Sequence, residues 1–325
     1  MAERPLPQPP PTATPAPSPA SAPRSNAPPA PPGAAGKKLA PVALPKSAPQ
    51  ATGRQIGDAP AAPAGGWNVT RGIQLRDAEG RVRFGERILL YGQAGIGKTT
   101  LASYMSNPLF LDLQGETSHI DGVARVDIES WDSLRAAVRD ANLWGSFDTL
   151  VIDNLTRAQQ MAVAWVCANI PDKGGEKRDS LEKFAYGGGP QLLADTFRTL
   201  LPDLDRVRAS GKHVLLIAHD IVDKVPNPNG ENFLRCEPDL YQSGTGKNTT
   251  NIRSAVVQWA DHVLAVYYDV AVFDGNKARG SGTRTIYPNP LPTHLAKSRV
   301  AWEPVPYDLN DPTAIWRAIG CLPSN

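Results

Sequence analysis

A glycine-rich stretch between Gly92 and Thr100 carries the pattern G-x-x-x-x-G-K-T, which ends in a lysine and two hydroxyl-bearing side chains. Gly95 and Gly97 allow the backbone to fold around phosphate oxygens without clashes of Cβ atoms. Lys98 would reach the β- and γ-phosphates of a triphosphate, and the Thr99 hydroxyl would be a ligand of Mg²⁺. The pattern therefore predicts a phosphate-binding loop (P-loop) for a nucleoside triphosphate, made of Gly92, Gln93, Ala94, Gly95, Ile96, Gly97, Lys98, Thr99 and Thr100.

The segments on both sides of this loop have the order that such a motif requires. Residues 88–91 are an apolar run that predicts a buried strand, and residues 99–105 have the composition of a helix. A helix that starts directly after the loop would add its N-terminal N–H groups to the phosphate site. This context disfavours the alternative of a chance glycine turn.

Asp153 ends another apolar run, residues 149–152, some fifty residues after Lys98. A carboxylate in this place would hold Mg²⁺ through water. The alternative is a strand-end carboxylate that caps the following helix. The next residue is Asn154 and not glutamate, so a group that activates water has to come from another strand.

Two later groups of residues could also act on a triphosphate. His219 and Asp220 follow the apolar run 213–218, beside the expected nucleotide site, where a polar side chain could sense the γ-phosphate. The alternative for His219 is a local hydrogen-bonding role. Lys297 and Arg299 could reach the γ-phosphate of a neighbouring subunit, as arginine fingers do, or could be an exposed basic pair.

Further cations lie among glycines in the second half of the chain. Glycine-rich loops with lysine and arginine suit contact with the backbone of a single strand, although ordinary solvated loops have the same composition. The candidates for contact with DNA are Lys247, Arg253, Lys277, Arg279 and Arg284.

Composition divides the 325 residues into two parts. Residues 1–66 hold more than half of the 32 prolines, many alanines and no aromatic residue, which predicts a disordered Pro/Ala-rich tail. Residues 67–325 are expected to form one domain. The tail has a charge balance of +4 and the whole chain +2, so the domain is near −2 and any contact with nucleic acid has to be local. We interpret the tail as a solvated spacer, with a docking segment for a protein partner as the alternative.

The three cysteines, Cys167, Cys236 and Cys321, have no paired spacing, so neither a zinc site nor a disulfide framework is expected. No apolar run approaches the length of a membrane span, which predicts no membrane association. The first residues lack the apolar segment of a signal peptide, and a cytoplasmic location is the expectation.

Strands and helices alternate along the domain, which predicts an α/β fold with a mostly parallel sheet and helices on both faces. Loops are expected at residues 171–189 and 221–250, and Asp311 is expected to cap a C-terminal helix. Besides the first strand, the expected strands are 109–113, 123–128, 149–153, 213–218, 263–268, 270–273 and 284–287, and the longer helices are 130–141, 155–168 and 191–209.

The P-loop and six further short segments resemble, in their order along the chain, the minimal RecA-core ATPases of bacteriophages, a group that includes single-strand annealing and recombination proteins. The resemblance implies a RecA-like P-loop NTPase core that binds ATP and Mg²⁺ and hydrolyses ATP. It also implies a homo-oligomer that handles single-stranded DNA in recombination or replication inside a bacterial host cell. It covers about residues 68–305 and rests on residues 91–100, 109–116, 149–154, 186–188, 215–220, 260–263 and 296–299.

The chain departs from related ATPases at three places. Ring-forming ATPases of the AAA+ kind and ABC cassettes commonly have a catalytic glutamate at the position of Asn154. RecA-like proteins usually have theirs at the position of Gln114, and here Glu116 follows two residues later. A glutamine orients water but cannot accept its proton, so either Glu116 takes this role or hydrolysis is slow. Glu116 could also be a solvated loop carboxylate. The tail replaces the N-terminal helical segment through which full RecA proteins polymerise, so filament formation does not carry over.

Other functions stay open at this point. Gln114 is compatible with a nucleotide-gated DNA-binding module that has negligible turnover, and a replicative helicase motor of the DnaB kind shares the core. A small-molecule kinase has little support, because no arginine-rich lid follows a compact substrate-binding segment. The guanine-selecting motif N-K-x-D is absent, since Asn276-Lys277 continues with Ala278-Arg279, which favours ATP over GTP.

Overall fold

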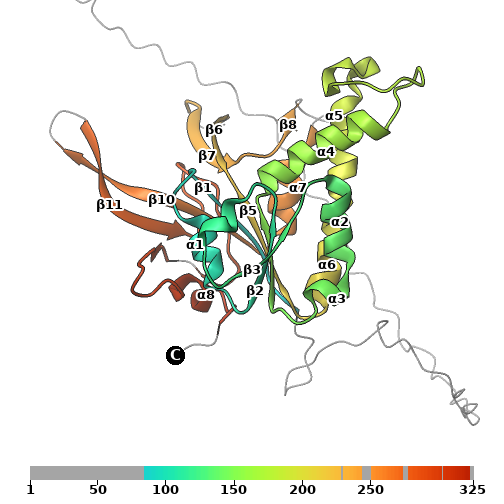
Figure 1. Ribbon diagram of the computed structural model, residues 1–325. Helices are drawn as coiled ribbons and strands as arrows, with labels where there is room; N and C mark the ends of the chain where they lie inside the picture. Colours follow the sequence, from blue (N-terminus) through green and yellow to red (C-terminus); the bar gives the residue numbers. More distant parts are fainter. Residues whose placement is uncertain (1–83, 228–229, 244–249, 274–276, 302, 323–325) are drawn as a thin grey trace, which may run out of the picture. The chain divides into compact units, whose positions relative to one another are not determined.

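The computed structural model describes residues 84–227, 230–243, 250–273, 277–301 and 303–322 (Figure 1). The tail predicted to be disordered, residues 1–66, lies outside these ranges. None of the helices within them has the length and apolarity required to cross a lipid bilayer.

An eight-stranded sheet is the centre of the described fold, with the strand order β12-β11-β10-β1-β5-β4-β2-β3. Six neighbouring strands are parallel, and the two at one edge are antiparallel, which confirms the expected mostly parallel α/β fold. The strands are β1 (Arg87–Gly92), β2 (Pro108–Asp112), β3 (Ala124–Asp127), β4 (Thr149–Asp153), β5 (His213–Ala218), β10 (His262–Phe273), β11 (Lys277–Tyr287) and β12 (Val305–Pro306).

The strand order determines where the candidate site lies. β5 lies between β1 and β4, and β4 pairs with β2 on its other side. Because these strands are parallel, their carboxyl ends meet at one edge of the sheet. The P-loop, His219, Asp153 and Gln114 directly or closely follow these ends, so the sheet brings them together.

Helices cover both faces of the sheet, as expected. On β1, Ile88 and Leu90 belong to one core and Leu89 and Tyr91 to the other, because alternate residues of a strand point to opposite faces. Figure 1 shows α1 and α8 on one side of the sheet and the longer helices on the opposite side. The first group is α1 (Lys98–Ser103) and α8 (Ala314–Ala318); the second is α2 (Trp131–Arg139), α4 (Leu155–Asn169), α5 (Gly189–Arg198), α6 (Leu200–Ala209) and α7 (Ile252–Trp259).

Short polar side chains cap the N-termini of three of these helices. Ser130 and Ser133 form a capping box at α2. The side chains of Asn154 and Asn251 accept the backbone N–H groups of Arg157 and Ser254 and so cap α4 and α7. Asn154 is therefore fixed by the helix that follows it, directly beside Asp153.

The prediction of one helix over residues 191–209 is wrong, because α5 and α6 meet at Thr199. Pro202 lies in the first turn of α6, where the absent N–H costs no helical hydrogen bond. A proline deeper in a continuous helix would have broken it, so the chain begins a new helix instead.

The prediction of a loop over residues 221–250 is also wrong for most of its described part. β6 (Asp220–Val225) and β7 (Phe233–Pro238) form an antiparallel hairpin, and β8 (Gln242–Ser243) pairs with β9 (Thr250–Asn251). The hairpin lies at the surface, and Val222 and Leu234 are exposed. Its sequence therefore lacks the buried apolar run that marks a core strand.

The remaining short elements are α3 (Ala141–Trp144) and three 3₁₀ turns, η1 (Glu116–His119), η2 (Leu181–Lys183) and η3 (Ala185–Gly187), of which η2 and η3 lie in the expected loop 171–189. The prediction that Asp311 caps the C-terminal helix is wrong, because α8 begins after Thr313 and has no side-chain cap. Asp311 binds the Arg317 guanidinium instead, at 2.5 Å.

Candidate nucleotide-binding site

The P-loop runs from the end of β1 into α1, as its pattern predicts. Gly95 and Gly97 have φ angles of 74° and 98°, which side chains with a Cβ rarely adopt. A cavity of about 520 Å³ lies over the loop and is lined by residues of the P-loop together with Gln114, Glu116 and His219. A cavity of this size is within the range of small-ligand sites in proteins.

Lys98 folds back onto the loop. Its Nζ donates hydrogen bonds to the carbonyl oxygens of Gly92, at 2.8 Å, and Gln93, at 2.9 Å. Burial lowers the pKa of Lys98, while the negative charges of Glu116, Asp153 and Asp220 oppose this shift. The carboxylates thus favour the charged ammonium, which is the form that binds phosphate.

Asp153 and Thr99 form the place where a divalent cation would bind. The Thr99 hydroxyl donates to Oδ2 of Asp153 at 2.7 Å, and the Asp153 side chain is fully buried. Its Oδ1 has no hydrogen-bond partner among the described residues. A buried carboxylate oxygen without a partner is costly, and an oxygen-coordinated cation such as Mg²⁺ would compensate it. The residues present therefore fit Mg²⁺.

The pKa of Asp153 agrees with this arrangement. Burial raises it to about 7, with further increases from the charges of Glu116 and Asp112, whereas the Thr99 hydrogen bond and Lys98 lower it. A bound divalent cation would favour the ionised carboxylate. No group of three or more His, Cys, Asp and Glu residues able to hold a metal occurs in the described ranges, so a cation here would take its other ligands from Thr99, phosphate oxygens and water.

Asn154 connects the polar residues that end β2 and β5. Its Nδ2 lies 3.0 Å from Oε1 of Gln114, 3.0 Å from Oε1 of Glu116 and 3.3 Å from Nε2 of His219. An amide nitrogen has two hydrogens, so it can donate to two of these three groups at a time. Gln114, Glu116 and His219 are thus brought together at one edge of the sheet. The connecting role of Asn154 was not predicted.

Asp112 shapes the turn that presents Gln114 and Glu116. Its carboxylate accepts the backbone N–H groups of Gln114, Gly115, Glu116 and Thr117, as well as the Thr117 hydroxyl. Burial alone would raise the pKa of Asp112, but these hydrogen bonds hold it below its usual value. Sequence reasoning missed this residue, although an aspartate followed by a glycine three residues later is a common turn signal.

Lys297 and Arg299 lie near the opposite end of the sheet from the P-loop. Nζ of Lys297 donates to the Val257 carbonyl oxygen at 2.7 Å, and Arg299 forms an ion pair with Asp261 at 2.9 Å. Asp261 directly precedes β10, which runs parallel to β1, so both cations are remote from the phosphate site of their own chain. Their action on a neighbouring subunit stays a prediction.

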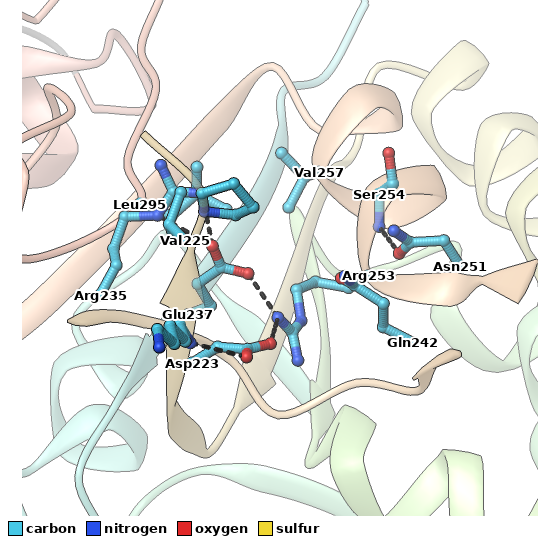
Figure 2. A pocket seen from close by; sticks show the side chains of 12 residues that line it. Asp223, Val225, Arg235, Glu237, Gln242, Asn251, Arg253, Ser254, Val257 and Leu295 are labelled. Atoms are coloured by element: carbon cyan, nitrogen blue, oxygen red, sulfur yellow. Dashed lines mark hydrogen bonds and ion pairs between the residues drawn. The ribbon is translucent and has the colours of Figure 1, made fainter. Parts of the chain in front are cut away.

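Arg253 does not lie in an exposed loop, which corrects the reason for choosing it as a DNA contact. It lies on α7 with its side chain 6% exposed, between Glu237 and Asp223 of the hairpin β6–β7. Figure 2 shows this network, which borders a cavity of about 280 Å³. The guanidinium holds the hairpin on α7 and is not available to a phosphate backbone.

The other DNA-contact candidates have different outcomes. Lys247 lies outside the described residues, and so do the side chains of Lys277 and Arg279, whose backbone lies on β11. Arg284 is described, and its guanidinium donates to the carbonyl oxygen of Ile96 in the P-loop at 2.7 Å. A role of Arg284 in the P-loop was not predicted.

This fold and site define the class of the protein, which is a P-loop nucleoside triphosphatase core. The defining features are the mostly parallel sheet with helices, the P-loop with its lysine and threonine, and the buried aspartate beside the threonine. A family model described as "AAA domain" matches residues 85–300, and the chain belongs to this family. Membership indicates a nucleotide-binding ATPase. A search of the curated proteins found no match.

Proposed function

We propose that this protein is an ATPase of the RecA-like type that binds single-stranded DNA as a homo-oligomer, in recombination or replication of the kind found in bacteriophages. The observation that carries the proposal is the contact of Asn154 with both Glu116 and Gln114, which line the same cavity as Lys98 and Thr99. This contact would hold a potential proton acceptor beside the phosphates.

In this proposal the residues of the chain have separate roles. Lys98 and the P-loop N–H groups bind the phosphates, and Thr99 and Asp153 would hold Mg²⁺, which neutralises phosphate charge. Water attacks the γ-phosphorus, the bond to the β,γ-bridging oxygen breaks, and ADP leaves. Gln114 orients the water, and Glu116 accepts the proton that the water loses. His219 directly precedes β6, so contact with the γ-phosphate would be passed to the hairpin β6–β7.

The DNA part of the proposal is supported by the long hairpin of β10 and β11, which extends away from the sheet (Figure 1). Lys277 and Arg279 lie on its outer part, where β11 pairs with Phe273 and Ala271. The oligomer is supported by Arg299, whose side chain is 65% exposed at the sheet end remote from its own site. There it could meet the nucleotide of a neighbour.

The experiment measures ATP hydrolysis by the full chain with single-stranded DNA, duplex DNA and RNA, with mass photometry on the same samples. Stimulation by single-stranded DNA, loss of nucleotide binding in Lys98→Ala and loss of Mg²⁺-dependent turnover in Asp153→Ala are the expected results. Lys277→Ala and Arg279→Ala should each reduce the salt dependence of DNA binding by about one phosphate contact. No DNA binding under any nucleotide condition would refute the proposal.

One observation favours a second function, a nucleotide-gated DNA-binding module with negligible turnover. Gln114 follows the end of β2 at the position where RecA-like proteins usually have their catalytic glutamate, and it cannot accept a proton. In this case nucleotide would still change DNA affinity, but phosphate release would stay at background with and without DNA. A helicase motor would in addition displace a strand from a forked duplex.

A further inference from the structure

We infer that Arg284 and Tyr307 are positioning residues for nucleotide binding, which act together as a brace that holds the P-loop in its phosphate-binding orientation. The inference rests on nucleotide binding at the P-loop and is independent of DNA and oligomer formation. The family match ends at residue 300, so Tyr307 lies outside the region that it covers.

The two residues contact adjacent carbonyl groups of the loop. Nη1 of Arg284 donates to the Ile96 oxygen at 2.7 Å, and the Tyr307 hydroxyl donates to the Gly97 oxygen at 3.0 Å. These contacts join parts of the chain that are 188 and 210 residues apart. Both therefore depend on the tertiary fold and not on the loop sequence.

Arg284 and Tyr307 also contact each other, so they form one unit. The guanidinium carbon of Arg284 lies 4.0 Å from the centroid of the Tyr307 ring. The backbone N–H of Tyr307 donates to the Arg284 oxygen at 2.8 Å, next to the pairing of β11 with β12. A cation over an aromatic face is attracted by the ring, which stabilises the pair in this position.

Peptide geometry explains how such a brace acts on phosphate binding. In a trans peptide the C=O and N–H groups point in opposite directions. Donors that fix the Ile96 and Gly97 oxygens therefore also fix the N–H groups of Gly97 and Lys98. At the Gly97 oxygen the Tyr307 hydroxyl acts together with the backbone N–H of Leu101 in α1, which donates at 2.8 Å. Neither Arg284 nor Tyr307 is among the residues that line the cavity over the loop, so the brace approaches the loop from outside it and leaves the cavity free for phosphate.

The fit between loop and brace is close. A Cβ atom on Gly97 would lie 2.7 Å from Nη1 of Arg284 and 2.9 Å from the Tyr307 hydroxyl. Gly97 is thus required both by its φ of 98° and by the brace. Burial raises the pKa of Tyr307, although the charge of Arg284 opposes this, so the hydroxyl keeps the proton that it donates.

The test compares Tyr307→Phe and Arg284→Met with Tyr267→Phe as the matched control. Tyr267 lies on β10, the strand next to β11, and its hydroxyl does not bind the Ile96 or Gly97 carbonyl groups. Calorimetry gives the Kd of each full-length variant for MgATP and for inorganic tripolyphosphate, and thermal unfolding without nucleotide gives Tm. Hydrogen exchange reports on the N–H groups of residues 97 and 98.

Tyr307→Phe should bind both ligands about 3- to 10-fold more weakly, because one neutral hydrogen bond is lost. The loss should be equal for MgATP and tripolyphosphate, since the brace acts on the phosphate cradle and not on the base. Exchange at residues 97 and 98 should become faster, and Tyr267→Phe should behave like the wild type. Arg284→Met should also weaken the binding of both ligands to the same extent. This variant still tests the inference if Tyr307→Phe does not fold.

A variant with a lower Tm but unchanged Kd and exchange, measured where it is fully folded, would overturn the inference, since the pair would then only stabilise the fold. Wild-type protein that binds neither MgATP nor tripolyphosphate would overturn the nucleotide site together with the brace. Binding of MgATP without any response to DNA would refute the proposed function and leave the brace intact.

Discussion

The side-chain nitrogen of Asn154 lies 3.0 Å from Oε1 of Glu116, while its side-chain oxygen accepts the backbone N–H of Arg157 at 2.7 Å. One residue thus both caps α4 and orients the carboxylate that we propose as proton acceptor. The two roles can be separated by substitution, because they use different atoms.

Asn154→Ser keeps an oxygen that can cap α4 but is too short to reach Glu116, and Asn154→Ala removes both functions. We expect the two variants to lose kcat to the same degree, with little change in KM. Only Asn154→Ala should also lose about 0.5–2 kcal/mol of stability through the missing cap. Steady-state kinetics and urea unfolding measure the two effects. A serine variant with wild-type kcat would show that Asn154 does not position Glu116.

Gln114→Glu should raise kcat about tenfold or more, because it places a proton acceptor beside the cavity over the P-loop. A well-positioned general base contributes about 10²- to 10⁴-fold to a rate, so tenfold is a low estimate. Glu116→Gln should lower kcat. Phosphate release under saturating ATP measures both. If both variants hydrolyse ATP at the wild-type rate, neither residue contacts the attacking water.

Asp153→Asn should change the pH dependence of stability in nucleotide-free, Mg²⁺-free protein. Because burial raises the folded pKa of Asp153 from 3.8 to about 7, the folded protein binds more protons than the unfolded chain between these values. Its contribution to stability is therefore present at low pH and lost as pH rises through this window. The asparagine variant should be the more stable protein at about pH 8, with a smaller difference at about pH 5.

Thermal unfolding across this pH range is the measurement, and Asp127→Asn, at an exposed position, is the control. Saturating Mg²⁺ should stabilise the wild type more than the variant. An unchanged pH profile in Asp153→Asn would mean that this carboxyl group is not the one that titrates.

Arg253→Met should destabilise the fold by about 1.5–3 kcal/mol, because the buried Glu237 carboxylate loses its charged hydrogen bond to Arg253 and keeps only the one to Arg235. Arg206→Met is the matched control, since the Arg206 side chain is 74% exposed, and it should stay within about 0.5 kcal/mol of the wild type. Urea unfolding measures both. A stable Arg253→Met protein with a weaker salt dependence of DNA binding would restore Arg253 as a DNA contact.

The sequence alone predicted the parts of the site that depend on local spacing or on the general order of a parallel sheet. The P-loop pattern includes its own strand and helix, and Asp153 follows from its place at a strand end. Gln114, Glu116 and His219 could be expected together because parallel strands place their carboxyl ends at one edge.

The roles of the arginines could not be predicted, because a cation in a sequence does not reveal its partner. Arg253 pairs with carboxylates 16 and 30 residues earlier, and Arg284 with a carbonyl 188 residues earlier. The hairpin β6–β7 was missed for a related reason. Its strands expose apolar side chains such as Val222 and Leu234, so no buried run marks them.

The P-loop belongs to the first strand–helix unit of the described fold, yet its support comes from the last one. Besides the Tyr307 contact, Nε1 of Trp316 on α8 donates to the Leu101 oxygen of α1 at 2.9 Å, across 215 residues. Because synthesis runs from the N- to the C-terminus, residues 307 and 316 join the chain long after the P-loop. The loop therefore reaches its fully supported form, and its highest affinity for nucleotide, only after these later residues have folded against it.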